Sequence, residues 1–160
     1  MNPPISKKIE AIRAYAAAGF ALIPLRGKLP TIRDWGSTPI GKYGEKELTG
    51  NYGVILRAQD VVIDVDPRRF KPGDDPLARL SAAIGGLSDS YTVRTGGGGL
   101  HIYLRKPAHV QIRGSLKEFP GIEFKTKGQQ VVGPGSVHPD SGNEYEIESG
   151  SPAAVGDTPL

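Results

Sequence analysis

The chain of 160 residues is long enough for one domain with a single hydrophobic core and too short for two comfortable cores. Its 22 glycines and 14 prolines exclude a coiled coil or long-helix bundle, and 38% apolar residues exclude a disordered chain. The lack of cysteine excludes disulfide scaffolds, thiolate metal sites and cysteine nucleophiles, while a net charge of +3 identifies no partner by itself.

Charge is unevenly distributed along the chain. Basic residues outnumber acidic ones over residues 94–127, whereas residues 140–160 carry acidic side chains and no lysine or arginine. A basic middle beside an acidic end is typical of a phosphate-attracting surface, and equally of an ordinary solvated face. No stretch has the length and hydropathy of a membrane span and no signal-peptide pattern is present, so we expect a soluble, cytoplasmic protein without a membrane partner.

The first third of the chain predicts one helix followed by strands. Ser6 is a typical helix N-cap, apolar residues follow it at helical spacing, and Gly19 ends the helix. Residues 20–25 are typical of a strand. Residues 51–56 and 61–65 predict two further strands, and the short polar turn between them suggests a hairpin.

The remainder predicts a second helix and then mostly β structure. Asp75 and Pro76 form a helix start, and Gly85 ends that helix. The following strand-like segments are short and separated by Gly, Pro or Ser: residues 91–95, 100–105, 109–113, 122–125, 129–133 and 144–147. Residues 149–160 have the composition of a linker-like tail.

Two acidic residues leave the same strand in the same direction. Side chains two residues apart share one face of a strand, so Asp64 and Asp66 point together, opposite their apolar neighbours. Crowded carboxylates are costly unless a cation lies between them, and Mg²⁺ or Mn²⁺ is the usual partner. A D-x-D pair is also common by chance, so a metal site needs further donors.

Two later strands show the same division between an apolar and a polar face. In residues 100–105 the alternation places His101 and Tyr103 on one face, directly after four glycines whose amides could approach phosphate oxygens. A tight turn is the simpler explanation for such glycines, and an ordinary surface position is the simpler one for His101. In residues 122–125, Glu123 and Lys125 face away from the apolar side chains.

If these strands are neighbours, their polar residues form one cluster. Asp64, Asp66 and Glu123 would then provide three carboxylates on one sheet face, with His101 close by. Such a set suits two divalent cations, one activating an attacking hydroxyl and the other holding a triphosphate with its leaving group.

These residues follow the order of three motifs of the archaeo-eukaryotic primase superfamily: Asp64-x-Asp66, Gly99-Leu100-His101 and Ile122-Glu123. More narrowly, the chain resembles the bifunctional primase-polymerase (prim-pol) domain at the N-terminus of phage and plasmid replication proteins. Further segments are similar to that domain in the same order: Gly27-Lys28-Leu29-Pro30 with Trp35, Asn51-Tyr52-Gly53-Val54, and residues 130–136. The resemblance covers residues 14–147.

The resemblance implies an α+β fold of the archaeo-eukaryotic primase type. An RRM-like, mostly antiparallel sheet would carry the metals on one open face, and an additional N-terminal α/β unit would help to close the cleft. Residues 1–148 would form this catalytic domain and residues 149–160 its linker-like tail.

The same resemblance implies roles for individual residues. Asp64, Asp66 and Glu123 would hold two Mg²⁺ or Mn²⁺ ions, and His101 would contact the phosphates of the incoming nucleotide. Further candidates for nucleotide contacts are Lys28, Asn51, Gly53, Gly98, Gly99 and Lys125. The chain departs from the family pattern at two positions, with Gly99 where serine is frequent and Glu123 where aspartate is frequent.

The implied activity is that of a DNA primase and DNA polymerase, a nucleotidyltransferase acting in replication. Its partners would be nucleoside triphosphates, a single-stranded DNA template with primer, and a C-terminal helicase module in a phage- or plasmid-encoded parent protein. Two alternatives remain open. The same carboxylates would suit a metal-dependent nuclease, and a non-catalytic single-stranded DNA or origin-binding module would need exposed aromatics, of which Tyr103 is the clearest candidate.

Overall fold

The computed structural model describes residues 5–87 and 89–158. Its helices are α1 (Lys7–Ala17) and α2 (Pro76–Ala83), with short 3₁₀ turns η1 (Trp35–Ser37) and η2 (Pro67–Arg69). Its strands are β1 (Leu22–Arg26), β2 (Leu29–Pro30), β3 (Asn51–Ile55), β4 (Asp60–Val65), β5 (Thr92–Arg94), β6 (Leu100–Arg105), β7 (Ile122–Lys125), β8 (Gln130–Val132), β9 (Glu146–Ser149) and β10 (Gly156–Asp157).

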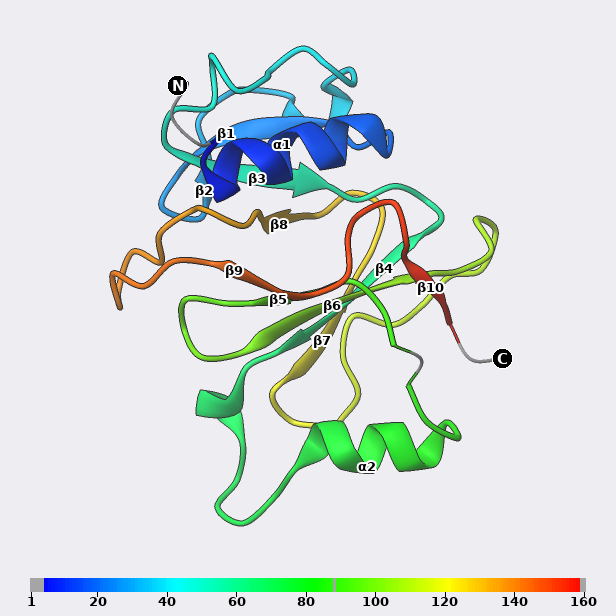
Figure 1. Ribbon diagram of the computed structural model, residues 1–160. Coiled ribbons are helices and arrows are strands. Elements are labelled where there is room, and N and C mark those ends of the chain that lie inside the picture. Colours follow the sequence, from blue (N-terminus) through cyan, green and yellow to red (C-terminus); the bar gives the residue numbers. More distant parts are fainter. Residues whose placement is uncertain (1–4, 88, 159–160) are drawn as a thin grey trace.

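The strands form two sheets. One is four-stranded in the order β2-β1-β3-β8, and the other is six-stranded in the order β7-β4-β6-β5-β9, with β10 paired to β6. All pairings except that of β10 with β6 are antiparallel. Figure 1 shows the four-stranded sheet with α1 at one end of the molecule, α2 at the other end, and the six-stranded sheet between them. The predicted α+β class is therefore confirmed.

Both predicted helices are present, with the predicted ends. The Ser6 hydroxyl accepts a hydrogen bond from the backbone N–H of Ile9 at 3.2 Å, and Gly19, with φ of 86°, follows the end of α1. The Asp75 carboxylate likewise accepts from the N–H of Ala78 at 3.1 Å at the start of α2. None of the helices within the described ranges is long and apolar enough to cross a membrane.

Apolar side chains pack against both faces of the six-stranded sheet. One face, including Ile63 and Ile102, packs on α2, while Val62 and Tyr103 on the opposite face pack against the N-terminal unit. Tyr103 is 1% exposed, and its hydroxyl lies 2.8 Å from that of Tyr15 on α1. The expectation that Tyr103 lies on an open face is therefore wrong, because the N-terminal unit covers this part of the sheet.

The predicted hairpin of β3 with β4 is also wrong. β3 pairs with β1 and β8, whereas β4 pairs with β6 and β7. Between them, the guanidinium of Arg57 donates to the carboxylate of Asp60 at 2.9 and 3.0 Å and fixes a turn that leads from one sheet to the other. Adjacent apolar strands favour a hairpin only when neither has a better partner elsewhere.

One further predicted strand is not formed. Residues 109–113 form a loop rather than a strand, and the ammonium of buried Lys106 donates to the carbonyl of Val110 in this loop and to that of Ala58, at 2.6 Å each. In the tail, β10 pairs with β6, and the N–H of Gly156 donates to the Ser90 hydroxyl at 2.7 Å. The described part of the tail thus lies on the sheet.

Candidate functional site

Three candidate residues form one row across the six-stranded sheet. Asp64 on β4 lies directly opposite His101 on β6 and, on its other side, opposite Glu123 on β7. Directly opposite residues in antiparallel strands point to the same face. Asp66 follows β4 by one residue and begins the 3₁₀ turn η2. The strands that were expected to be neighbours are therefore neighbours, and they bring the three carboxylates and the histidine to one side of the sheet.

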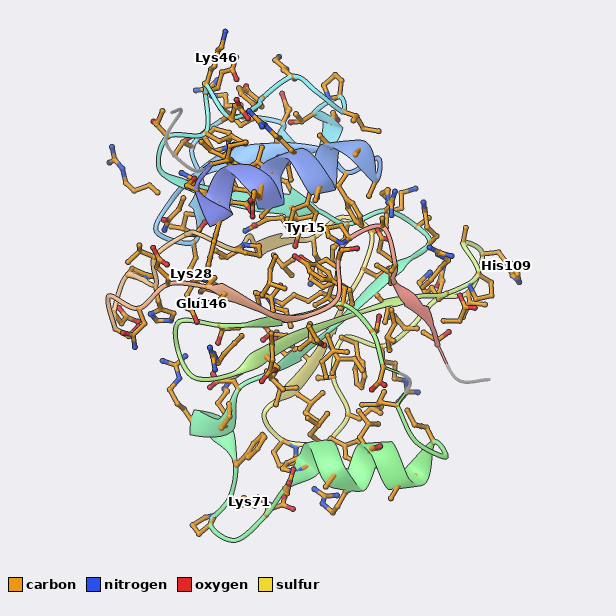
Figure 2. The ribbon with its side chains drawn as sticks, in the orientation of Figure 1. Tyr15, Lys28, Lys46, Lys71, His109 and Glu146 are labelled. Carbon is orange, nitrogen blue, oxygen red and sulfur yellow. The ribbon has the colours of Figure 1, made fainter. Side chains whose placement is uncertain are left out.

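This row lines a cavity of about 200 Å³ between the two sheets. Its wall includes Lys28 from the β1–β2 turn, Gln130 from β8 and His138 from the following loop, so both sheets contribute to it. Figure 2 shows Lys28 extending from the four-stranded sheet toward the six-stranded one. The cavity therefore has an acidic side on β4 and β7 and a basic residue reaching it from the opposite sheet.

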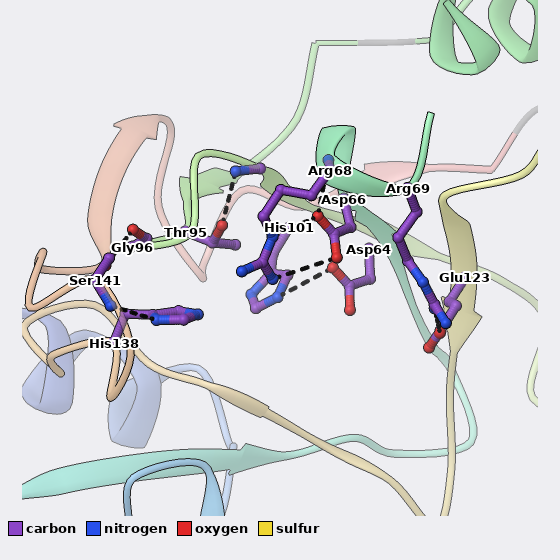
Figure 3. Close-up of polar contacts among 11 residues, drawn as sticks. Asp64, Asp66, Arg68, Arg69, Thr95, Gly96, His101, Glu123, His138 and Ser141 are labelled. Carbon is purple, nitrogen blue, oxygen red and sulfur yellow. Dashed lines mark hydrogen bonds and ion pairs between the residues drawn. The ribbon is translucent and has the colours of Figure 1, made fainter. Parts of the chain in front are cut away.

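Each of the three carboxylates pairs with a basic side chain: Asp64 with Lys125 at 3.2 Å, Asp66 with Arg68 at 3.0 Å, and Glu123 with Arg69 at 3.1 Å. Figure 3 shows the pairs of Asp66 and Glu123. Burial alone would raise the pKa of Asp66, but hydrogen bonds from Arg68 outweigh it and hold that pKa below its usual value. Crowded carboxylates are thus compensated by cationic side chains of the chain itself.

The chemistry of these donors suits a hard divalent cation, because carboxylate oxygens are the ligands that Mg²⁺ and Mn²⁺ prefer. Within residues 5–87 and 89–158, however, no three acidic or histidine side chains converge closely enough to hold an ion. The arginine partners explain this, since Asp66 and Glu123 are each turned toward one. The arginine side chains of the two pairs are 55% and 65% accessible and their carboxylate partners 30% and 45%, so opening these partly exposed pairs costs about 1 kcal/mol or less.

His101 is an uncharged member of the row at neutral pH. Its side chain is buried, and burial lowers the pKa of His101 to about 4, although Asp64 acts in the opposite direction. Its Nε2 lies 3.6 Å from the Asp64 carboxylate, which is too far for a direct hydrogen bond. Its Nδ1 has no partner among the described residues. A buried imidazole with unused hydrogen-bonding capacity faces the carboxylates.

Two of the remaining candidates, Asn51 and Gly53, are not among the described residues that line the cavity. The side chain of Asn51 donates to the carbonyls of Gly27 and Val137 at 3.0 and 2.8 Å and accepts from the N–H of Val137 at 2.8 Å. At Gly53, a Cβ would collide with the side chain of Gln130. Asn51 therefore ties two loops together, and Gly53 makes room for a residue of the wall.

The glycine run has a mainly structural explanation. The Thr95 hydroxyl accepts from the N–H of Gly99 at 2.8 Å and closes a tight turn in which Gly98 has φ of 87°. A Cβ at Gly99 would collide with the carbonyl of Val65 on the neighbouring strand. Of the four glycines, Gly97 is the one on the described wall of the cavity, whereas Gly98 and Gly99 shape the turn.

Sequence reasoning missed several residues of the wall. Arg68 and Arg69 were detectable in principle, as basic residues in a proline-started turn directly after Asp66. His138 and Tyr145 gave no local signal. The ring centroid of Tyr145 lies 6.1 Å from that of His101 and 6.1 Å from that of His138. Burial raises the pKa of Tyr145 to about 12.

Comparison with known protein families found a match over most of the chain. The family model of the bifunctional DNA primase/polymerase N-terminal domain matches residues 12–159. No curated protein matched the chain. The match includes the acidic row, the basic turn at Lys28 and the loop that carries His138. The chain therefore belongs to the family of bifunctional DNA primase/polymerase N-terminal domains.

Proposed function

We propose that the chain catalyses template-directed nucleotidyl transfer, in which a primer 3′-hydroxyl attacks the α-phosphorus of a nucleoside triphosphate and pyrophosphate leaves. Membership of the family supports a primase/polymerase-type function in DNA replication, with DNA and nucleotides as interaction partners. The observation that carries the proposal is the row of Asp64, His101 and Glu123 on one wall of a cavity that Lys28 reaches from the opposite sheet.

Asp64, Asp66 and Glu123 would hold the divalent cations, Mg²⁺ or Mn²⁺, in exchange for their present basic partners. When bound, such cations stabilise the negative charge that develops on the reacting phosphates. The Lys125 ammonium lies 3.2 Å from the Asp64 carboxylate. If a cation took its place on Asp64, this ammonium would be able to donate a hydrogen bond to a phosphate oxygen.

The basic side chains around the cavity would bind and orient the triphosphate. Lys28 approaches from the four-stranded sheet, while Arg68 and Arg69 belong to η2 beside the acidic row. His101, whose pKa burial lowers to about 4 in the free protein, would offer a hydrogen-bonding group toward phosphate. The negative charge that develops on the reacting phosphates would thereby be stabilised by groups that the two sheets already hold in place.

The proposed activity is tested by primer extension with Asp64→Asn and Asp66→Asn variants on a primed single-stranded template. Both should lose incorporation by a factor of about 100 or more, because each loses a charged ligand while keeping its shape. Glu118→Gln, at an exposed carboxyl away from the cavity wall, is the matched control and should retain activity. Extension by an Asp64→Asn/Asp66→Asn double variant at the wild-type rate would overturn the metal-ligand assignment.

Assays on the same purified protein distinguish nucleotidyl transfer from the two alternative functions. Strand cleavage of labelled DNA with Mn²⁺ and no triphosphate would indicate a nuclease. Binding of single-stranded DNA without any metal-dependent nucleotide binding would indicate a non-catalytic module. Buried Tyr103 argues against that module, since the aromatic expected to stack on bases lies in the core.

A further inference from the structure

His138 is a buried residue of the cavity wall whose protonation is set by its own loop. The side chain is 2% exposed, and its Nδ1 accepts hydrogen bonds from the backbone N–H groups of Asp140 and Ser141 at 3.2 Å each. Figure 3 shows the contact with Ser141. A ring nitrogen that accepts hydrogen bonds carries no proton, so in the neutral imidazole the proton lies on Nε2.

The Nε2–H group of His138 is a buried hydrogen-bond donor in a residue of the cavity wall. Among the described residues it has no hydrogen-bond partner, although the atom is fully buried. It lies on the cavity wall beside Gly97, where an added Cβ would be 3.2 Å from Nε2 and 3.4 Å from the guanidinium carbon of Arg68. An unpaired buried donor is costly, so an acceptor supplied by a ligand would be stabilising.

Contacts with neighbouring residues position His138. Its ring stacks on that of Tyr145 at 6.1 Å with an interplanar angle of 20°. Its neighbour Val137 is bound through both N–H and carbonyl to Asn51, which also binds the carbonyl of Gly27 beside Lys28. The loop carrying His138 and the turn carrying Lys28 are thus tied to the same side chain.

The charges near His138 favour an anion. Burial lowers the pKa of His138, and the cations of Lys28 and Arg68 act in the same direction, against Asp140 and Asp66. A neutral N–H, an ammonium and a guanidinium therefore line the same part of the cavity wall. All three groups donate hydrogen bonds, and a phosphate offers several acceptor oxygens with negative charge.

We propose that the Nε2–H of His138 donates a hydrogen bond to one of the two phosphates that leave as pyrophosphate, in a phosphate subsite formed by His138, Lys28 and Arg68. The proposal rests on the nucleotidyl transfer proposed above and specifies where the triphosphate tail lies. His101 and the carboxylate row then face the transferred phosphate.

Two substitutions at His138 separate hydrogen-bond donation from loop structure. His138→Asn keeps an acceptor near the amides of Asp140 and Ser141 but removes the donor at the position of Nε2, whereas His138→Gln carries an amide N–H that reaches farther. His109→Asn, at an exposed histidine outside the described cavity wall, is the control. The affinities for nucleoside triphosphate, inorganic pyrophosphate and nucleoside monophosphate are measured by calorimetry with Mg²⁺.

We expect His138→Asn to weaken triphosphate and pyrophosphate binding about 10- to 100-fold, as for loss of a hydrogen bond to a charged group, and to leave monophosphate binding unchanged. His138→Gln should recover part of the loss, and in primer extension KM should rise with kcat nearly unchanged. Equal triphosphate affinities of wild type and His138→Asn would overturn the subsite while the proposed function stands. If the wild type binds no triphosphate, the proposed function fails as well.

A measurement on the unaltered protein covers the case in which the variants do not fold. With ¹⁵N-labelled histidine, His138 should show the Nε2–H tautomer in the free protein, and addition of pyrophosphate with Mg²⁺ should shift its Nε2–H resonance downfield. A resonance that does not move at saturating pyrophosphate would overturn the proposal.

Discussion

At the scale of single residues, the site depends on side chains whose ionisation is set by burial. His101 is 6% exposed and its pKa is lowered to about 4, so it stays neutral beside the carboxylate of Asp64. A group of this kind makes the stability of the whole protein depend on pH, because its proton affinity differs between the folded and unfolded states.

We therefore expect acid to destabilise the protein through His101. The contribution is complete above the unfolded pKa of about 6.5 and is lost as pH falls toward 4, since in that window the unfolded chain binds a proton that the folded chain does not. The loss amounts to about 3 kcal/mol at most. Urea unfolding of wild type and His101→Gln at pH 7 and pH 4.5 measures it, and an equally large loss in the variant would assign the effect to other groups.

At the scale of elements, the turn η2 places two arginines against the acidic row. Pro67 begins the turn and the Asp66 carboxylate accepts from the backbone N–H of Arg68 at 3.1 Å, so Arg68 and Arg69 follow β4 immediately. Arg68 pairs with Asp66 and Arg69 pairs with Glu123. These are two of the carboxylates that would bind cations in the proposed function. A short local turn therefore controls the charge of the site.

Removing Arg69 should free Glu123 for a cation. We expect Arg69→Ala to tighten Mn²⁺ binding severalfold in the absence of nucleotide, because the exposed pair it breaks is worth less than about 1 kcal/mol. Arg79→Ala, which breaks the pair with Asp74 at 2.9 Å near α2, is the matched control and should leave Mn²⁺ affinity unchanged. Weaker Mn²⁺ binding in Arg69→Ala would show that Glu123 is not released to the ion.

At the scale of the whole molecule, the cavity exists because two sheets are held together by a core between them. The hydroxyl of Tyr15 on α1 lies 2.8 Å from those of Tyr91 and Tyr103, which belong to the six-stranded unit. All three rings are buried. Since Lys28 and His101 lie on opposite sides of the cavity, its geometry depends on these contacts.

Loss of the Tyr15 side chain should destabilise both sheets together. Tyr15→Ala removes a large buried ring and leaves two hydroxyls without a partner, so we expect a loss of about 3–5 kcal/mol, whereas Tyr15→Phe should cost about 1–2 kcal/mol. Denaturant unfolding followed by circular dichroism and by Trp35 fluorescence tests this. Separate transitions for the two probes would mean that the sheets unfold independently.

Local patterns predicted much of this structure because they depend on near neighbours. Capping at Ser6 and Asp75 predicted both helices, and alternation over residues 100–105 and 122–125 predicted β6 and β7 with the observed bounds. The same alternation predicted that Asp64 and Glu123 point away from the apolar side chains. Each of these inferences needs only the backbone period of 2 or 3.6 residues.

The sequence by itself thus determined the two helices and most strands through their local period, and its resemblance to a known family implied the α+β class and a cluster of acidic residues with a histidine. Only the tertiary structure decided that β3 and β4 belong to different sheets, that Tyr103 is buried, and that His138 reaches the cavity. Those outcomes depend on which distant surfaces pack together, and the free energy of such packing is shared among residues far apart in the chain.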